Sequence, residues 1–379
     1  MIFNLVVMCI ICLFGFMLIS LPDKNHDNFK IRKFYVIIVS IILILQSGLR
    51  NVAVGADTYA YFVYFEQTKN KSWSEIWQVQ NEYIINAIGK DPGYVLFQKI
   101  VQLIITDYHI FLFLIAILFF ASFGNFLLKN TERINELIIA YLLYSALFYA
   151  FYSITGHRQT IATAGAFWAY EYLKKRKLLP FLIIILLSSL IHKSCLIFFP
   201  FYFLANFINP RVAMVIGLSV TPFFVAVKDQ LALILAIVAG YDYYGVEETA
   251  TYTFTLMLVA IAALALITMK QNLKRSNLKF AYIGFSLAIS LTPLTWVNGA
   301  MMRVVQYYAF FLLLLVPSSL NALKIISRKL GKVAYMLIII SLFSLYMKNS
   351  WKHEYRFLWQ EMALGDHYKE FLKSPFSKY

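Results

Sequence analysis

Charged residues are scarce in this chain. Asp, Glu, Lys and Arg make up 14% of its 379 residues, whereas 61% are hydrophobic and the mean hydropathy is +0.69. Soluble domains carry about 25% charged residues, so this composition excludes a soluble globular protein. Continuous apolar runs at 2–21, 34–49, 108–128 and 252–269 approach or reach the ~20 residues that a helix needs to cross a bilayer. Because the runs do not alternate, we expect helices rather than barrel strands, and hence an all-α polytopic integral membrane protein.

Cysteine is also scarce, and its positions argue against two kinds of site. Cys9, Cys12 and Cys195 lie in or beside apolar runs, with neither metal-ligand spacing nor the pattern of a disulfide framework. We therefore expect the three cysteines to be packing residues. We expect neither a metal site nor a cofactor. The first apolar run lacks a basic start and a small-residue cleavage site before Pro22, so we interpret it as a retained first span.

Positive charge is abundant but dispersed. The net charge of +15 is not gathered in one soluble domain, which argues against a nucleic-acid partner. Basic residues instead lie in short loops between apolar runs, as the positive-inside rule describes for cytoplasmic loops. We therefore expect segments 23–33, 174–177, 270–279 and 324–332 in the cytoplasm. Segment 50–91 has four basic and five acidic residues, a net charge of −1, and is expected outside.

These loops constrain the number of spans. If residues 94–105 crossed the membrane, the basic segment 174–177 would lie outside, so we interpret 94–105 as a re-entrant or interfacial helix. Residues 231–240 are also too short to cross, and they precede an acidic, aromatic loop at 241–248 that is expected outside. The result is about 12 transmembrane helices plus one or two re-entrant or interfacial helices, with both termini outside.

The same pattern sets the domain organisation. We expect one transmembrane domain over residues 1–347, with an extracytoplasmic loop at 50–93. A GT-C-like architecture is compatible with this organisation. The tail at 348–379 is amphipathic and aromatic, and we expect it to lie on the membrane surface.

Five polar side chains are predicted to converge on the outer face of the membrane. They lie at the expected outer ends of spans: Arg50, Asp57, Arg158, His192 and Arg303. A charge at the centre of a spanning helix costs roughly 2.5–3.5 kcal/mol, so charges near spans tend to face cavities. Taken singly, each arginine is more often a snorkelling side chain and each histidine a helix cap. Taken together, the five favour a functional site.

Arginines beside an aqueous cavity suit a multivalent anion. Guanidinium groups bind phosphate oxygens bidentately and stay charged in a partly dry site, so a diphosphate is the natural ligand. Asp57 or His192 could accept a proton from a hydroxyl group. The outer loops are rich in Tyr and Trp, which stack on sugar rings but also form aromatic belts at membrane interfaces.

Several short motifs follow one another along the chain. Residues 50–61 read R-x4-G-x-D-T-x2-Y, residues 91–94 read DPGY, residues 157–159 read HRQ followed by Ala162, and residues 191–194 read IHKS. Over about 50–203, and more loosely to RVVQYY at 303–308, the chain resembles the EpsG family of Wzy-like polymerases of bacterial exopolysaccharide, capsule and O-antigen. The family usually has glutamate at the position of Asp91. Aspartate keeps the negative charge but has a shorter reach, so no direct chemical role is predicted for Asp91. Nothing is carried over after Leu320.

The resemblance implies a multi-pass enzyme of the bacterial cytoplasmic membrane whose active site faces outward. Its substrates would be oligosaccharide repeat units on undecaprenyl diphosphate, and it would transfer the growing glycan to the next unit. Membrane lipids are further partners, and a chain-length regulator is left open. No nucleotide-sugar site is expected, since the chain has no DxD pair and no Gly-rich phosphate loop. An O-antigen ligase and a lipid-linked oligosaccharide flippase remain the alternatives.

Residue roles follow from the chemistry and the resemblance together. Arg158 and Arg303 are predicted to bind the diphosphate, and Arg50 to assist them or to order the first outer loop through Asp57. Asp57 or His192 would be the catalytic base. The motifs also imply four substrate-binding residues, Tyr61, Tyr94, His157 and Gln159.

Overall fold

The computed structural model describes residues 2–20, 28–55, 57–86, 91–239, 252–296, 299–351, 354–365, 369 and 372–373. Within these residues all regular structure is helical, apart from one β-bridge between Arg50 and Phe357. This agrees with the expected all-α class. The loop at 241–248 lies outside the described residues, so its position stays a prediction.

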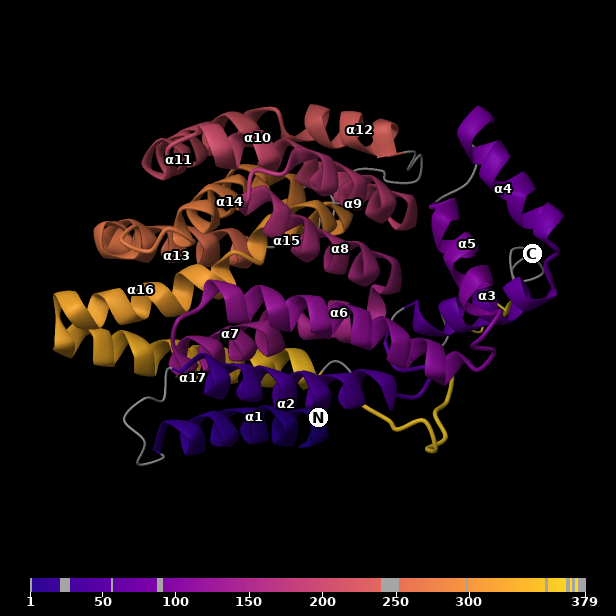
Figure 1. Ribbon diagram of the computed structural model, residues 1–379, viewed down its shortest axis with the longest axis horizontal. Coiled ribbons are helices and arrows are strands. Elements are labelled where there is room, and N and C mark those ends of the chain that lie inside the picture. Colours follow the sequence, from indigo (N-terminus) through magenta and orange to yellow (C-terminus); the bar gives the residue numbers. More distant parts are fainter. Residues whose placement is uncertain are drawn as a thin grey trace.

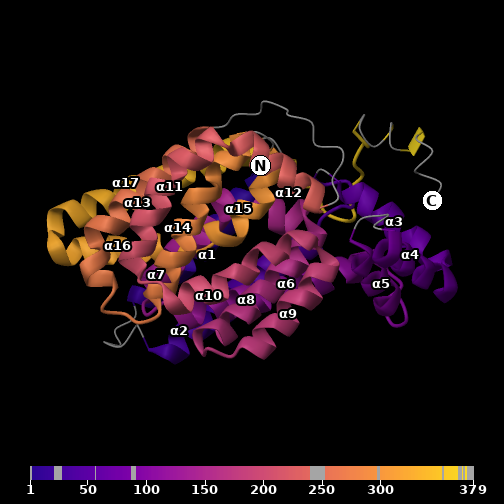
Figure 2. The same ribbon diagram turned by 90° about the horizontal axis from the view of Figure 1, so that it is seen from above.

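Long helices run side by side in an elongated bundle (Figure 1). They are α1 (Ile2–Ser20), α2 (Phe29–Gly48), α6 (Tyr108–Asn130), α7 (Ile134–Leu147), α8 (His157–Lys174), α9 (Leu178–Ile191), α11 (Pro210–Ala226), α13 (Tyr252–Asn272), α14 (Leu278–Leu291), α16 (Leu312–Ile326) and α17 (Arg328–Trp351). Shorter elements lie between them: η1 (Ala150–Thr155), η2 (Lys193–Phe198), α10 (Phe199–Phe207), α12 (Lys228–Ala239), η3 (Thr292–Trp296), η4 (Gly299–Met301) and α15 (Met302–Ala309). A separate group lies at one end of the bundle (Figures 1 and 2): α3 (Thr58–Asn70), α4 (Trp73–Asn86) and α5 (Pro92–Val101).

Fewer helices than expected are long enough to cross a membrane. Among the described residues five qualify by length and composition, in α1, α6, α13, α14 with η3, and α17. A sixth results if α15 and α16, bent by 42°, form one broken span. Helices such as α7 and α9 have 14 residues each. At ~1.5 Å per residue they measure about 21 Å, short of a hydrocarbon core of ~30 Å. The structure supports a membrane protein of several spans, but neither 12 spans nor a GT-C-like architecture is confirmed.

The two short segments singled out in the sequence are short helices. Residues 94–101 of the first segment lie on α5, which has 10 residues. Of the second segment, the described residues 231–239 lie on α12, which has 12. Neither is long enough to cross a bilayer, since even 12 residues span only about 18 Å.

Basic segments gather at one end of the bundle. Glu136 accepts hydrogen bonds from Arg275 and Asn321, which brings segments 270–279 and 324–332 together. Lys174 donates to Asn130, just before α7, so the segment 174–177 lies at the same end. This arrangement matches the common side that the positive-inside rule predicts for these loops.

The opposite end carries the predicted site. Arg50 follows the end of α2, and α3–α5 come next in the chain. Residues 354–360 return to this corner, where they pair their backbone with residues 49–51. The ring of Phe3 lies 4.5 Å from that of Tyr355, so the start of α1 is also here. These residues of the expected tail at 348–379 pack on protein, and a membrane-surface location for the remainder stays a prediction.

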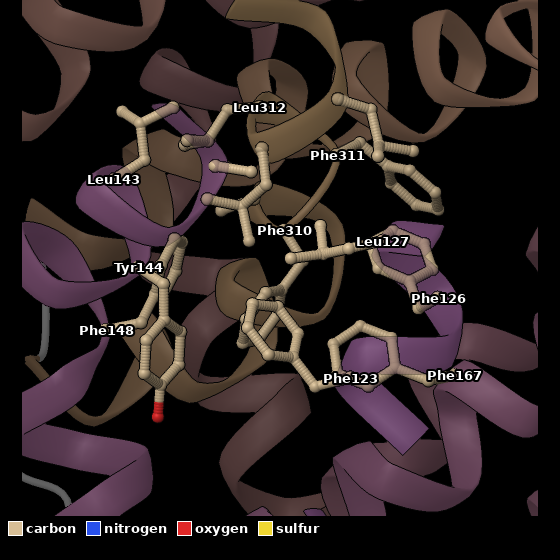
Figure 3. Packing of buried hydrophobic residues seen from close by; sticks show 14 of the residues in the cluster. Phe123, Phe126, Leu127, Leu143, Tyr144, Phe148, Phe167, Phe310, Phe311 and Leu312 are labelled. Atoms are coloured by element: carbon tan, nitrogen blue, oxygen red, sulfur yellow. The ribbon is translucent and has the colours of Figure 1, made fainter. Parts of the chain in front are cut away.

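An aromatic core fixes the helices that carry the site (Figure 3). Phe123 and Phe126 come from α6, Phe167 from α8, and Phe310 and Phe311 from the junction of α15 and α16. The Phe310 ring lies 5.0 Å from that of Phe167. Burial of such rings stabilises by roughly 1.5–3 kcal/mol each, so the packing holds α8 against α15. Arg158 and Arg303, on these two helices, are thereby set in position.

A smaller core attaches α3 and α5 to the bundle. Phe65 of α3 stacks on Phe111 of α6 with ring centroids 4.7 Å apart. Tyr94 of α5 and Tyr108 of α6 belong to the same buried cluster. The outer group is therefore packed on the bundle and not merely linked to it.

Candidate active site

Six of the nine residues singled out from the sequence line one small hollow at this end of the bundle. The hollow has a volume of about 20 Å³, and its walls are Asp57, Tyr61, Phe151, Thr155, Gly156, Arg158, Gln159, His192 and Arg303. These residues come from α3, η1, α8, α15 and the turn after α9. The other three, Arg50, Tyr94 and His157, are buried around it. Within the described residues, no group of three or more His, Cys, Asp or Glu side chains is arranged to hold a metal ion.

His192 is held by Asp91. Its Nδ1 lies 2.9 Å from Asp91 Oδ2, and the backbone N–H of Lys193 donates to Asp91 Oδ1 at 3.1 Å. His192 is only 2% exposed. Because a carboxylate only accepts hydrogen bonds, Nδ1 is the protonated nitrogen, which leaves Nε2 as an acceptor in the neutral ring. Within the described part of the chain, Nε2 has no hydrogen-bond partner.

The DPGY motif explains how Asp91 reaches this histidine. Asp91 caps α5 with a φ of 48°, and Pro92 opens the helix. A Cβ atom on Gly93 would lie 2.5 Å from the carbonyl oxygen of Leu190, so glycine lets α5 pack directly on the end of α9. His192 follows that end at once. The motif therefore serves to set the carboxylate against the histidine.

Asp91 also pairs with Arg158. Arg158 Nη1 lies 2.9 Å from Asp91 Oδ2, with side-chain exposures of 19% and 0%. The guanidinium lies 5.9 Å above the ring of Tyr61. No direct chemical role is predicted for Asp91 from the sequence, whereas its carboxylate contacts two of the predicted site residues, His192 and Arg158. The signal for this role in the sequence is the negative charge that Asp91 shares with the glutamate usual in the family. The shorter side chain is sufficient because His192 and Arg158 both lie within hydrogen-bonding distance of it.

The electrostatics of the pair favour a neutral histidine beside an ionised carboxylate. Burial raises the pKa of Asp91, but the hydrogen bond and charge of His192, with Arg158 and the Lys193 backbone, lower it below its usual value overall. Burial lowers the pKa of His192, and its contact with Asp91 offsets only part of this. A histidine with a lowered pKa is neutral at pH 7 and able to accept a proton.

Arg50 lies behind the hollow. Its Nη2 donates to His157 Nε2 at 2.7 Å and to the Ile154 carbonyl at 3.0 Å, while Nη1 bonds to Ser47. Arg50 is 2% exposed. The pairing of Arg50 with Asp57, considered from the sequence, is not seen: Asp57 is exposed at the start of α3. Arg50 instead orders η1, whose π-helical turn is a form common near functional sites.

His157 and Tyr61 continue this support toward the hollow. The ring of Tyr61 stacks on that of His157 with centroids 4.5 Å apart and an interplanar angle of 19°. Since arginine only donates, His157 accepts at Nε2. The buried Arg50 thus supports His157 through a hydrogen bond, and His157 supports Tyr61 at the wall of the hollow through ring stacking.

Arg303 and Gln159 link α15 to α8. Gln159 Nε2 donates to the backbone carbonyl of Arg303 at 2.8 Å and to Tyr152 Oη at 3.2 Å. The Arg303 guanidinium is half-buried, and among the described residues it has no hydrogen bond or ion pair. Its charge is therefore not compensated by a neighbouring acid, unlike that of Arg158.

A larger cleft adjoins the small hollow. Its volume is about 400 Å³, and it lies between α3 and α5. Tyr61 and Arg158 line both spaces. Asp91 and Tyr94 line the larger one. The two spaces are neighbours with a shared wall.

The model of the EpsG family, whose members are Wzy-like polysaccharide polymerases, matches residues 33–362. This range includes every predicted site residue, and it extends well beyond the region of motif resemblance, through α16 and α17 to residue 362. No curated protein and no solved structure matches the chain.

Proposed function

The chain belongs to the EpsG family, and from that premise we propose that it polymerises oligosaccharide repeat units carried on undecaprenyl diphosphate. One observation carries the proposal: a histidine oriented by a carboxylate shares a hollow with two arginines, Arg158 and Arg303. A proton acceptor beside two cations suits a transfer in which a hydroxyl group attacks and a diphosphate leaves.

The reaction assigns a role to each group. A hydroxyl group of the incoming repeat unit attacks the anomeric carbon that joins the growing glycan to its diphosphate. A new C–O glycosidic bond forms and the C–O bond to the diphosphate breaks, with the bonding electrons remaining on the diphosphate. The hydroxyl proton passes to His192 Nε2. Arg158 and Arg303 stabilise the charge that develops on the leaving group.

His192 is a better candidate for the base than Asp57. Asp91 holds the His192 ring in one tautomer, and the acceptor nitrogen has no other partner within the described residues. Asp57 lines the same hollow but is exposed, and no described side chain orients its carboxylate. Asp57 then contributes to binding of the acceptor. Tyr61, Tyr94, His157 and Gln159 shape and support the site.

The proposed location follows from the two ends of the bundle. Basic segments lie at one end and the hollow at the other. If the basic end faces the cytoplasm, the hollow faces outward, where lipid-linked repeat units are polymerised. We place the protein in the bacterial cytoplasmic membrane on this basis.

The glycan profile of a deletion strain tests the function. Loss of a polymerase leaves single repeat units on the final acceptor, and complementation with the wild-type chain restores the polymer. Polymer that accumulates on the carrier lipid would instead identify a ligase. Repeat units trapped in the cytoplasm would identify a flippase, and either result overturns the proposal.

A further inference from the structure

The larger cleft beside the hollow is lined by aromatic and amide side chains together with the charged groups of Lys71, Asp91 and Arg158. Tyr61, Tyr64 and Tyr94 contribute rings, and Gln67 and Gln98 contribute amides. Its volume of about 400 Å³ falls within the ~300–1,000 Å³ of small-molecule sites. Aromatic faces and amide groups together are suited to sugar rings, whose C–H faces stack and whose hydroxyl groups both donate and accept.

Two polar groups beside the cleft lack partners within the described residues. Gln98 Nε2 and Tyr94 Oη make no hydrogen bond there. The two residues are 1% and 4% exposed, so bulk water does not satisfy them. Buried polar groups are nearly always paired, and an unpaired donor next to a cavity points to a missing ligand.

The walls of the cleft are held in place by hydrogen bonds between the helices that flank it. Lys99 Nζ on α5 donates to the Thr68 carbonyl at the end of α3, at 3.3 Å. Gln102 Nε2 donates to the Phe65 carbonyl at 2.7 Å. On the other side of α5, Gln80 Nε2 of α4 donates to the Pro92 carbonyl at 2.8 Å. The cleft is therefore preformed, as sites for small ligands usually are.

We propose that the cleft between α3 and α5 is a saccharide subsite that binds a sugar ring of the lipid-linked oligosaccharide beside the two arginines that line the hollow. The inference rests on the proposed function, which it deepens by assigning the glycan to the cleft and the contacts with the diphosphate to Arg158 and Arg303. Tyr61 and Arg158, which line both spaces, mark the boundary between sugar and phosphate. Tyr64 provides a stacking face, and Gln98 and Tyr94 provide hydrogen bonds to hydroxyl groups.

Binding of a glycan without phosphate tests the subsite. The probe is the repeat-unit oligosaccharide released from the strain's own polymer, free of lipid and phosphate, titrated onto the full chain in nanodiscs. We expect Gln98→Leu and Tyr64→Ala to weaken binding at least tenfold. Gln78→Leu is the matched control, because Gln78 lies on α4, outside the cleft, and is exposed. Arg303→Ala should bind the probe as the wild type does, since Arg303 lines only the small hollow.

Kinetics with the lipid-linked substrate separate binding from misfolding. Gln98→Leu should raise KM about tenfold with kcat within about threefold of the wild type, whereas a folding defect would lower the active fraction and hence kcat. A wild-type chain that does not bind the probe, or a Gln98→Leu variant that binds it normally, overturns the subsite. If Gln98→Leu binds the probe normally but the deletion strain lacks polymer, the subsite is wrong and the proposed function stands. A deletion strain with normal polymer defeats the proposed function instead.

Discussion

The contact between Asp91 and His192 leads to a prediction about pH. His192 must be neutral to accept a proton, and burial lowers its pKa below 6.5. Polymerisation should therefore be steady near pH 7 and fall as the pH drops through that lowered pKa. Asp91→Asn removes the carboxylate that raises the pKa of His192, so the acidic limb of the profile should move to lower pH. The kcat should also fall by about 10²–10⁴ because the base loses its orientation.

Initial rates between pH 5 and pH 8 measure both effects. His192→Ala should abolish the activity, and with it the fall in rate at acidic pH. The matched control is Asp107→Asn, which alters a helix cap at the start of α6 outside both spaces. An unchanged limb in Asp91→Asn would mean that His192 is not the base.

The two arginines of the hollow should respond differently to substitution. Arg303 has no described partner, so Arg303→Ala should lower kcat by about 10²–10³ without reducing the thermal stability of the protein. Arg158 pairs with Asp91, and Arg158→Ala leaves a buried carboxylate with one cation fewer. We expect loss of activity together with a lower melting temperature. Arg158→Lys should recover little activity, because an ammonium group cannot bind bidentately.

Chain-length ladders and thermal melts of the purified variants measure these outcomes. Arg211→Ala is a suitable control, since Arg211 is exposed at the start of α11. Normal ladders from both Arg158→Ala and Arg303→Ala would rule out a diphosphate clamp.

At the scale of elements, the packing of α5 on α9 determines whether the site forms. Gly93→Ala places a methyl group 2.5 Å from the Leu190 carbonyl, which forces the two helices apart. Asp91 would move with α5, so we expect activity to fall more than tenfold while the protein still reaches the membrane. Gly365→Ala is the control, because a Cβ atom there meets nothing within 4 Å. Wild-type activity in Gly93→Ala would show that this packing does not set the pair.

Much of the helical organisation could be predicted from the sequence, for a physical reason. Apolar runs indicate helices and basic loops indicate a common end, and the structure accordingly places Arg275, Lys174 and Asn321 at one end and the hollow at the other. The number of spans could not be predicted in this way. The 14-residue helix α7 is apolar because it lies in the protein core, and hydropathy does not distinguish core from lipid.

The gathering of site residues was also predictable in part. Span boundaries at one face place Asp57, Arg158, His192 and Arg303 near each other, and they line one hollow. Which side chains touch is a different matter, because pairings depend on how helices pack. The contact of Asp91 with His192 could therefore not be predicted. Of the two roles predicted for Arg50, pairing with Asp57 is not seen, because its hydrogen bonds go to His157 and to backbone carbonyls.

At the scale of the whole molecule, the two ends of the bundle predict which surfaces are accessible from each side of the membrane. Ser72 is exposed in the turn between α3 and α4, and Lys177 is exposed in the basic segment before α9. In intact cells, a membrane-impermeant maleimide should label Ser72→Cys but not Lys177→Cys. Permeabilised cells should show labelling of both.

The native thiols give little background in this experiment. Cys12 and Cys195 are buried and Cys9 is half-buried. The unsubstituted chain is the control. Labelling of Lys177→Cys in intact cells would invert the orientation and place the hollow in the cytoplasm, where the proposed reaction does not occur.

The pairing of residues 354–360 with residues 49–51 has a consequence for biosynthesis. The corner that holds Arg50 is made before α17, whereas residues 356–358, which pair with it, are made after α17. Until then the backbone at this corner lacks this partner, so its packing is completed only after α17 has been made. A chain that ends before residue 356 would therefore leave Leu49 and Asn51 without these two backbone hydrogen bonds.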